Sequence, residues 1–423
     1  MTEALTPEIL KNIVKNKKFY IYSANMEGIG YSRLLKNKGI NIDGFIDSRY
    51  PFGSLKMGKP IIHPDVFFMS DKFADTCVLI ASKHRKFKKT AIQECEKNGL
   101  IKNQTYFIGM ELCEYMPTIE VVGSCNLKCL TCPMGLHDSR SGGIMQPATY
   151  RKVLEKMTSE IHFLNSIYLF LWGEPFLHPR LNEIIDITHD FGIACEISTN
   201  LNICKNLESI IKTNPDVIAV PCSGVEKHYE TTHLGGNWKT FKQNLYALRK
   251  YIDKYNAETS VKLYYHMYQH NLERDYDILR DISQELGYTF FPIIASIFPE
   301  KIFDLVVNEK PLPPEMQLAS EFLIYPIEDQ LKFAYENKDS FCPFKKAFPT
   351  IRWDLSVVSC TNMTKPLLFD NYLNVSLEEI NKTRDSLAHC KKCMEHGIHK
   401  FFDVVNVTVN ETDGKRSIIR KMQ

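Results

Sequence analysis

The sequence lacks the features that mark membrane-spanning, exported and nucleic-acid-binding proteins. None of its apolar runs approaches the roughly 20 residues that a bilayer-spanning helix needs. The first residues, Met1 to Ala4, show no basic region followed by a hydrophobic one, so we expect no export signal and a cytoplasmic location. The formal net charge is only +2, which gives no reason to expect nucleic acid or an anionic membrane as a partner.

Cysteine, by contrast, is abundant, with 13 residues in a 423-residue chain of otherwise ordinary composition. A framework of disulfides is not expected in a reducing compartment, which leaves metal ligation or isolated thiols. Six cysteines stand alone in the sequence, and we expect them to be plain core or surface thiols: Cys77, Cys95, Cys113, Cys195, Cys204 and Cys222. The other seven form two sets with spacings typical of metal sites.

The first set is Cys125, Cys129 and Cys132, spaced Cys-x3-Cys-x2-Cys directly after the apolar run 119–122. Three thiolates on one loop can hold three irons of a 4Fe–4S cluster. The fourth iron then has no protein ligand and stays open to a small molecule. The alternative is a zinc site, which needs a fourth ligand close by, and His137 is the only candidate.

The second set comprises Cys342, Cys360, Cys390 and Cys393. Four cysteines complete the ligand set of a 4Fe–4S cluster and leave no iron open. The alternative is a structural zinc ribbon, which typically uses two Cys-x2-Cys pairs. Because only one such pair is present, we favour an auxiliary iron–sulfur cluster.

The N-terminal region, residues 1–112, predicts a small Rossmann-like domain, because strand and helix patterns alternate with short loops. A dinucleotide site is an alternative, with Asp47 at the end of the second strand as a ribose ligand. However, Ser23 and Asn25 stand where the first two glycines of the phosphate-binding turn would align. We therefore favour a docking or substrate-recognition module.

From residue 117 to 310 the alternation continues with longer units. The expected strands are 119–123, 166–171, 194–198, 217–220, 261–267 and 289–294. Six strand–helix repeats predict a partial parallel (β/α)6 barrel, whose chemistry collects at the carboxyl ends of the strands. A helical linker over 311–340, a cysteine-bearing domain over 341–402 and a basic tail over 403–423, expected to be a frayed end, complete the α/β architecture.

Several motifs in the central region resemble the radical S-adenosylmethionine superfamily. Besides the cysteine triplet, the segment 171–175 (Leu-Trp-Gly-Glu-Pro) resembles the Gly-Gly-Glu-Pro turn of the family, with Trp172 in place of the first glycine. The third strand ends in Ser-Thr-Asn (198–200), where the family often has Thr-Asn-Gly. The segment 223–238 also resembles a family segment, although Ser223 and His233 replace the usual Asp and Arg.

This resemblance implies that S-adenosylmethionine binds the open iron and yields a 5′-deoxyadenosyl radical. It implies a cofactor-binding set of Gly173, Glu174, Asn200, Ser223 and Asn271, with the methionine amino group received near Gly173 and Glu174. A flavodoxin- or ferredoxin-type protein would supply the electron.

The second cysteine set resembles the twitch form of the SPASM domain, which carries one auxiliary cluster. This implies an oxidoreductase that dehydrogenates an alcohol carbon of a sugar or nucleotide-sugar-like substrate, with the auxiliary cluster accepting an electron. Three alternatives stay open: a maturase of ribosomal peptides, a redox-neutral sugar epimerase, and a non-catalytic iron–sulfur scaffold. For an epimerase, Cys222 is the best candidate for a thiol that returns a hydrogen atom.

Overall fold

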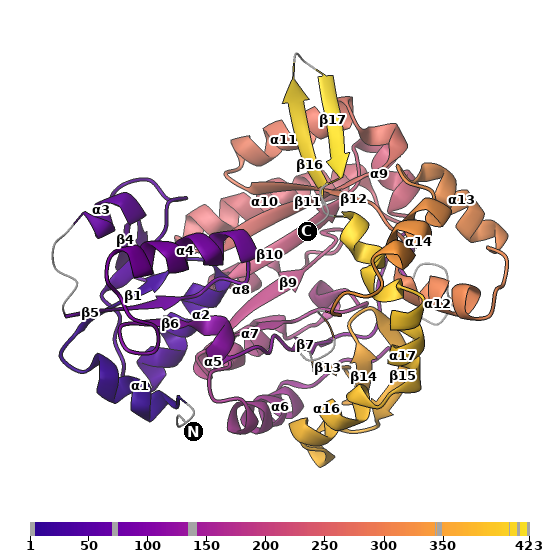
Figure 1. Cartoon of the computed structure of the whole chain (residues 1–423). Helices are drawn as coiled ribbons and strands as arrows, with labels where there is room; N and C mark the ends of the chain where they lie inside the picture. The colour runs from indigo at the N-terminus through magenta and orange to yellow at the C-terminus, as the bar shows by residue number, and fades with distance from the viewer. Residues whose placement is uncertain are drawn as a thin grey trace.

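The computed structural model describes residues 5–69, 75–133, 142–342, 344, 349–405, 407–412 and 415–420. Two sheets flanked by helices account for most of this part of the chain, and the expected α/β class is confirmed. In Figure 1 the N-terminal sheet lies on the left, the large sheet in the middle and the C-terminal helices on the right. No helix in the described ranges is long and apolar enough to cross a bilayer.

The N-terminal sheet has six strands in the order β3-β4-β2-β1-β5-β6, all parallel except for the β3–β4 pair. Its elements are α1 (Pro7–Val14), β1 (Lys18–Tyr22), α2 (Met26–Asn37), β2 (Gly44–Ile46), β3 (Leu55–Lys56), β4 (Lys59–Ile62), α3 (Pro64–Phe68), β5 (Thr76–Ile80), α4 (Arg85–Lys97), β6 (Tyr106–Ile108) and α5 (Gly109–Leu112). Strand β5, Thr-Cys-Val-Leu-Ile, is buried along its whole length, as expected for a parallel strand covered on both faces.

Two glycines near the start of α2 have a packing role. A Cβ on Gly28 would lie 1.9 Å from the carbonyl oxygen of Ser23, so glycine is required where α2 turns back against β1. A Cβ on Gly30 would lie 1.8 Å from the carbonyl oxygen of Asn165, which belongs to the second sheet. The glycine pattern is therefore explained by close helix packing, without a bound nucleotide.

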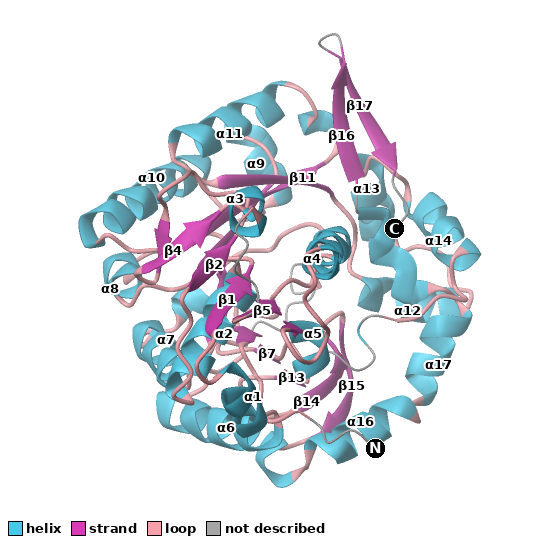
Figure 2. Cartoon of the chain, turned by 60° about the vertical axis from the view of Figure 1, so that its left-hand side comes forward, coloured by secondary structure: helices cyan, strands magenta, loops and turns pink. Residues whose placement is uncertain are grey.

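The second sheet contains the six expected barrel strands, parallel and in chain order. Its strands and helices are β7 (Thr118–Ile119), α6 (Pro147–Glu160), β8 (Ser166–Tyr168), η1 (Pro175–Leu177), α7 (Leu181–Asp190), β9 (Ala194–Ser198), α8 (Leu207–Lys212), β10 (Val217–Cys222), α9 (Glu226–Thr232), α10 (Trp238–Tyr255), β11 (Ser260–Met267), η2 (Gln269–Asn271), α11 (Arg274–Glu285) and β12 (Thr289–Ile294). Figure 2 shows helices α6, α7, α8, α10 and α11 in an arc around the outside of this sheet.

Three further strands extend the same sheet beyond β7, in the order β7-β13-β14-β15. Strand β13 (Thr350–Ile351) runs parallel to β7, and β14 (Val357–Cys360) and β15 (Met363–Phe369) follow in antiparallel order. The second cysteine region therefore joins the barrel sheet at the strand that precedes the first cysteine set. The sequence did not indicate this continuation.

The C-terminal third is otherwise helical. It contains α12 (Pro299–Val307), α13 (Pro314–Phe322), α14 (Ile327–Glu336), η3 (Tyr372–Asn374), α16 (Leu377–Asp385), α17 (Ala388–Glu395) and η4 (Ile398–Val405). Residues 311–340, which the sequence suggested as a linker, hold α13 and α14. Both helices contribute to a separate apolar cluster that includes Met316, Leu323 and Phe401.

The expected frayed end over 403–423 is a wrong prediction for its described part. Strands β16 (Val407–Thr412) and β17 (Lys415–Arg420) form an antiparallel pair, which projects from the top of the molecule in Figure 1. The β-branched residues at 407–409 and 418–419 favour strands, and the polar and charged residues around them hid this signal in the sequence.

The N-terminal unit packs against the amino ends of the barrel strands. Arg33 on α2 pairs at 2.5 Å with Asp216, which immediately precedes β10. Lys56 donates to the carbonyl oxygen of Glu258, just before β11, at 2.6 Å. Because the cysteine triplet follows the carboxyl end of β7, the N-terminal unit docks at the end of the barrel opposite to it (Figures 1 and 2).

Candidate functional site

The first cysteine loop is fixed by backbone bonds to the segment that follows α9. The amide of Lys128 donates to the carbonyl oxygen of Leu234 at 2.7 Å, and that of Leu130 donates to Thr232 at 3.0 Å. From the other side, the ammonium of Lys301 donates to the carbonyl oxygen of Cys132 at 2.9 Å. These contacts hold an otherwise irregular loop at the carboxyl end of the barrel.

The three thiols of this loop lie close enough to influence one another. Each side chain keeps partial exposure, but the surrounding atoms desolvate Cys129 and the neighbouring Cys132 and Cys125 add repulsion, so that its pKa is raised well above the ordinary value. Three thiolates at this spot are unstable without a cation. This donor set fits a metal centre that accepts three sulfur ligands. His137, the alternative zinc ligand, lies outside the described residues.

Gly173 lets the turn after β8 approach the cysteine loop. A Cβ at this position would lie 1.8 Å from the carbonyl oxygen of Val122, so no other residue fits. The next amide, of Glu174, donates to the carbonyl oxygen of Ser124 at 2.8 Å. The Gly-Glu turn and the cysteine loop are thus joined by backbone contact.

Glu174 has a buried carboxylate, 3% exposed, held between two strand ends. It accepts hydrogen bonds from the amides of Phe176 at 2.9 Å and Asn200 at 2.8 Å. Burial nevertheless dominates and raises the pKa of Glu174 to about 7. A cation placed beside this carboxylate would restore its charge.

Asn200 connects the end of β9 to the cysteine loop. Its side-chain nitrogen donates to the amide oxygen of Asn126 at 3.0 Å and lies 3.8 Å from the sulfur of Cys125. The fold therefore brings Gly173, Glu174 and Asn200 together with the cysteine triplet, as the resemblance implied.

Ser223 and His233 form an uncharged pair at the end of β10. The hydroxyl of Ser223 lies 2.7 Å from Nδ1 of His233 and also bonds to the hydroxyl of Thr232. His233 stacks on Tyr229 with ring centroids 4.5 Å apart. Burial lowers the pKa of His233 to about 3, so the imidazole is neutral at physiological pH. A neutral pair thus occupies the two positions at which the sequence departs from the family pattern.

Asn271 lies in the turn after β11 and is 1% exposed. Its side-chain oxygen accepts from the amide of Tyr268 at 2.8 Å, and its nitrogen donates to the carbonyl oxygen of His266 at 3.0 Å. These bonds shape the turn. The structure thus gives Asn271 a role in holding the loop that follows His266.

Cys222, the candidate hydrogen donor, is completely buried at the end of β10. Its sulfur lies 3.3 Å from the carbonyl oxygen of Gly224, and burial raises the pKa of the thiol. The side chain belongs to the main hydrophobic core. Cys222 is therefore in an environment typical of a small apolar core residue.

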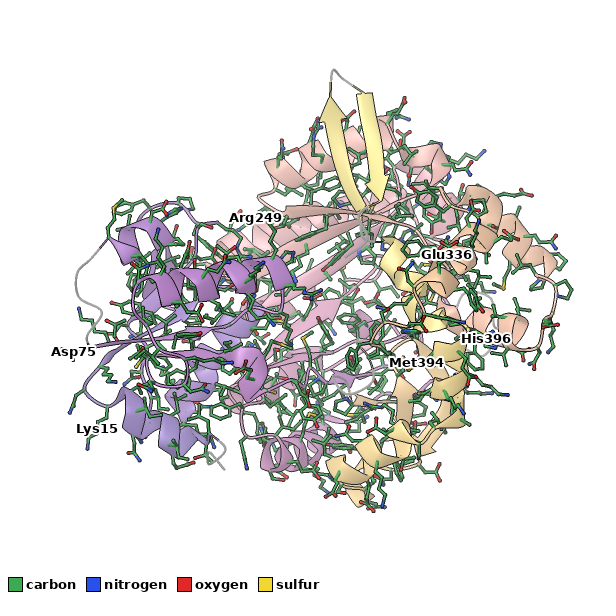
Figure 3. The ribbon with its side chains drawn as sticks, in the orientation of Figure 1. Lys15, Asp75, Arg249, Glu336, Met394 and His396 are labelled. Carbon is green, nitrogen blue, oxygen red and sulfur yellow. The ribbon has the colours of Figure 1, made fainter. Side chains whose placement is uncertain are left out.

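The four cysteines of the second set line one cavity, although they come from separate elements. The cavity has a volume of about 40 Å³. Its cysteines are Cys342 ahead of β13, Cys360 at the end of β14, and Cys390 and Cys393 on α17. Met394, labelled in Figure 3, lines the same cavity.

These four thiols have the chemistry of a complete cluster site. Burial, together with the neighbouring Cys342 and Cys390, raises the pKa of Cys360 to about 12, and the pKa of Cys393 is raised by the same causes. The amide of Asn362 lies 3.2 Å from the sulfur of Cys360 and can stabilise a thiolate. Four cysteines around one cavity can supply the complete ligand set of a 4Fe–4S cluster, with no iron left open.

Several polar residues of the barrel were not among the site residues expected from the sequence. Lys262 on β11 pairs at 2.7 Å with Glu196 on β9. Burial, together with the same carboxylate, raises the pKa of Tyr168 on β8. Glu120 lies 3.6 Å from Arg352 and accepts from the amide of Trp172 at 3.2 Å. A charged residue inside an apolar strand pattern was the signal that could have revealed Glu120 and Glu196.

Comparison with known proteins gives one significant curated relative. No family model matches the chain. A 130-residue segment is 26% identical to the S-adenosyl-L-methionine-dependent 2-deoxy-scyllo-inosamine dehydrogenase of Niallia circulans. The predicted resemblance to enzymes that use S-adenosylmethionine is confirmed. The match covers 29% of this chain and 47% of the relative, so the chain spans about half the length of that protein.

Three solved structures also align with the chain over much of its length. BtrN in complex with AdoMet and 2-DOIA is 16% identical over 67% of this chain and 87% of its own, with a TM-score of 0.38. Native anSMEcpe with bound AdoMet is 17% identical over 68% and 88%, with a TM-score of 0.42. Streptococcus suis SuiB bound to S-adenosylmethionine is 13% identical over 74% and 76%, with a TM-score of 0.42.

Proposed function

We propose that the protein is a radical S-adenosylmethionine enzyme that oxidises a hydroxyl-bearing carbon of a small, sugar-like substrate. The observation that carries this proposal is the assembly of Cys125, Cys129 and Cys132 with the Gly173–Glu174 turn at the carboxyl ends of neighbouring strands. The curated relative is named as a dehydrogenase of 2-deoxy-scyllo-inosamine, which supports dehydrogenation as the reaction.

The cysteine triplet would hold three irons of the first cluster. With S-adenosylmethionine on the open iron, this centre supplies a 5′-deoxyadenosyl radical that removes one hydrogen atom from the substrate. The backbone at Gly173 and the carboxylate of Glu174 would hold the methionine amino group. Because that group is a cation, it keeps Glu174 ionised despite the burial that raises its pKa.

The interior face of the barrel suits a polar substrate. Along β11 buried and partly exposed residues alternate, and the partly exposed set includes Lys262, Tyr264 and His266. The buried set, by contrast, packs into the hydrophobic core. Together with Glu196 on β9 and Tyr168 on β8, these residues offer charged and hydroxyl groups that can bind hydroxyls or amines.

Oxidation of an alcohol carbon to a ketone removes one hydrogen atom, one proton and one further electron. The hydroxyl proton passes to solvent or to a base on the interior face of the barrel, where His266 lies on the partly exposed side of β11. The four thiolates of Cys342, Cys360, Cys390 and Cys393 would hold a second cluster, which supplies an acceptor for the electron. The reductant of the first cluster is a flavodoxin- or ferredoxin-type protein.

The test is product analysis under strictly anaerobic conditions. Reconstituted protein, S-adenosylmethionine and a chemical reductant are incubated with sugars, aminocyclitols and nucleotide sugars. We expect 5′-deoxyadenosine in equal amount to a product two mass units lighter than one of these substrates. Absence of 5′-deoxyadenosine with every compound, from protein that holds about eight irons per chain, would contradict the proposal.

A substrate that leaves the reaction with an inverted centre and unchanged mass would identify an epimerase instead. A linked thioether in a peptide substrate would identify a maturase.

A further inference from the structure

A buried arginine faces the second cysteine cavity. Arg384, on α16, is 1% exposed and is among the largest fully buried side chains in the described ranges. It lines the same cavity as the four cysteines. Burial lowers the pKa of its guanidinium, while Cys360 and Cys390 oppose this shift and favour the charged form. A cation in this position is expensive unless negative charge lies beside it.

Two further polar atoms lie at the same cavity. Among the described residues, neither the hydroxyl of Ser359 nor Nε2 of His389 has a hydrogen-bond partner, and both atoms are buried. Both residues line the cavity. The ring of His389 is held by stacking on Phe303, with centroids 3.7 Å apart. Buried donors without partners are rare, so an acceptor in the cavity would explain them.

We propose that Arg384, assisted by the hydroxyl of Ser359, sets the reduction potential of the auxiliary cluster and makes it an electron acceptor. This inference rests on the proposed function, which places a cluster on the four cysteines. A 4Fe–4S centre with four thiolates carries net negative charge, and accepting an electron makes that charge larger. A fixed cation and a hydroxyl donor stabilise the reduced form more than the oxidised form, and therefore raise the potential.

The placement of Arg384 suits a residue that acts through the cluster. Its helix carries a second cation, Lys382, two positions away, which is exposed to solvent. Water and salt screen that exposed charge, whereas the buried guanidinium acts across a medium of low dielectric. Arg384 and Lys382 therefore form a matched pair for the experiment: both are cations on one helix, but only the buried Arg384 should affect the potential of the cluster.

The experiment is a redox titration followed by electron paramagnetic resonance. It uses the full chain with Cys125, Cys129 and Cys132 replaced by alanine, so that only the auxiliary cluster remains. Arg384→Gln, Arg384→Lys and the control Lys382→Gln are compared in this background. We expect R384Q to lower the equilibrium constant for reduction about tenfold, which is about 59 mV for one electron. R384K should stay within about threefold of the parent, and K382Q should not differ from it.

An unchanged midpoint potential in R384Q that still holds its irons would overturn the inference. If R384Q does not retain iron, Ser359→Ala decides: we expect a smaller shift in the same direction, and an unchanged potential there would overturn the inference as well. A parent background that holds zinc or no iron at all would instead contradict the proposed function, so the two failures are distinguishable.

Discussion

The two cysteine sites differ in how the chain builds them and in the charges it places around them. The cysteines of both sites are partly exposed, and the first site takes its three from one loop at the end of the barrel. The second takes four from distant segments and encloses them around a cavity. Three ligands leave a metal corner for a small molecule, whereas four ligands leave none.

A buried ionisable group lies beside each site, and the two groups have opposite charges. A carboxylate, Glu174, lies behind the first site, and a guanidinium, Arg384, lies at the second. A carboxylate suits the binding of an amino group, and a guanidinium suits the acceptance of an electron. We infer that the chain gives one site to cofactor activation and the other to electron transfer.

The largest effect is expected from loss of a first-site ligand. Cys125→Ala should lower the formation of 5′-deoxyadenosine by at least about 1,000-fold, because the open-iron centre cannot assemble. Iron per chain should fall from about eight to about four. The measurement is anaerobic metal analysis with a single-turnover assay, and Cys77→Ala, which removes an isolated thiol, is the control. Normal cleavage of S-adenosylmethionine by C125A would contradict the assignment of cofactor activation to the first site.

Removal of the second site should separate the two halves of the reaction. The double variant Cys390→Ala/Cys393→Ala should still cleave S-adenosylmethionine, but should form the oxidised product about 100-fold more slowly, since the second electron lacks its acceptor. Chromatography of both products in the same reaction measures the ratio. An oxidised product formed at the rate of the parent would show that the auxiliary site has no redox role.

Adding one methyl group at Gly173 should weaken the binding of S-adenosylmethionine at the first site without changing the second site. Gly173→Ala would place a Cβ 1.8 Å from the carbonyl oxygen of Val122, so the turn must move away from the cysteine loop. We expect the affinity for S-adenosylmethionine to fall by about 10- to 100-fold, measured by equilibrium binding to reconstituted protein. The control is Thr90→Ala, at an exposed position on α4 in the N-terminal unit. Equal binding by both variants would contradict the role given to the turn.

The smallest effect concerns pH. The pKa of Glu174 is raised to about 7 by burial, so the group is protonated below that pH and ionised above it. S-adenosylmethionine should therefore bind more tightly, by up to about tenfold, as pH rises through 7. The ligand-free protein should lose the corresponding stability over the same rise, because the folded state binds the proton more strongly than the unfolded state.

Glu174→Gln should abolish both trends, since it cannot ionise. Binding isotherms and thermal unfolding between pH 5.5 and 8.5 measure them, with the values chosen to bracket a pKa of about 7. A parent protein whose binding does not change with pH would contradict this role of the carboxylate.

The parts that the sequence predicted well are those encoded by neighbouring residues. The six barrel strands followed from alternating patterns, and the turn at Gly173 followed from a five-residue motif. The assignment of both cysteine sets to clusters stays a prediction, although the structure brings the members of each set together. Ser223 and Asn271 were chosen by resemblance, and their bonds to His233 and to backbone could not be read from the sequence.

The rest depended on contacts between distant segments. Glycine is required at position 30 by the carbonyl oxygen of Asn165, which immediately precedes β8 in the second sheet. Nothing near Arg384 in the sequence distinguishes it from an exposed cation on an amphipathic helix. Only the fold, which pairs β13 with β7 and packs α16 against β15, buries Arg384 beside the cysteines.

The most direct test of the central claim is the spectrum of the first cluster during titration with S-adenosylmethionine. The variant C390A/C393A holds only that cluster, and electron paramagnetic resonance of its reduced form reports the environment of each iron. We expect the signal to shift and saturate at one equivalent of S-adenosylmethionine per cluster, because the nucleoside occupies the iron that the protein leaves open. A spectrum that stays the same throughout the titration would show that the corner is closed, and would contradict the assignment.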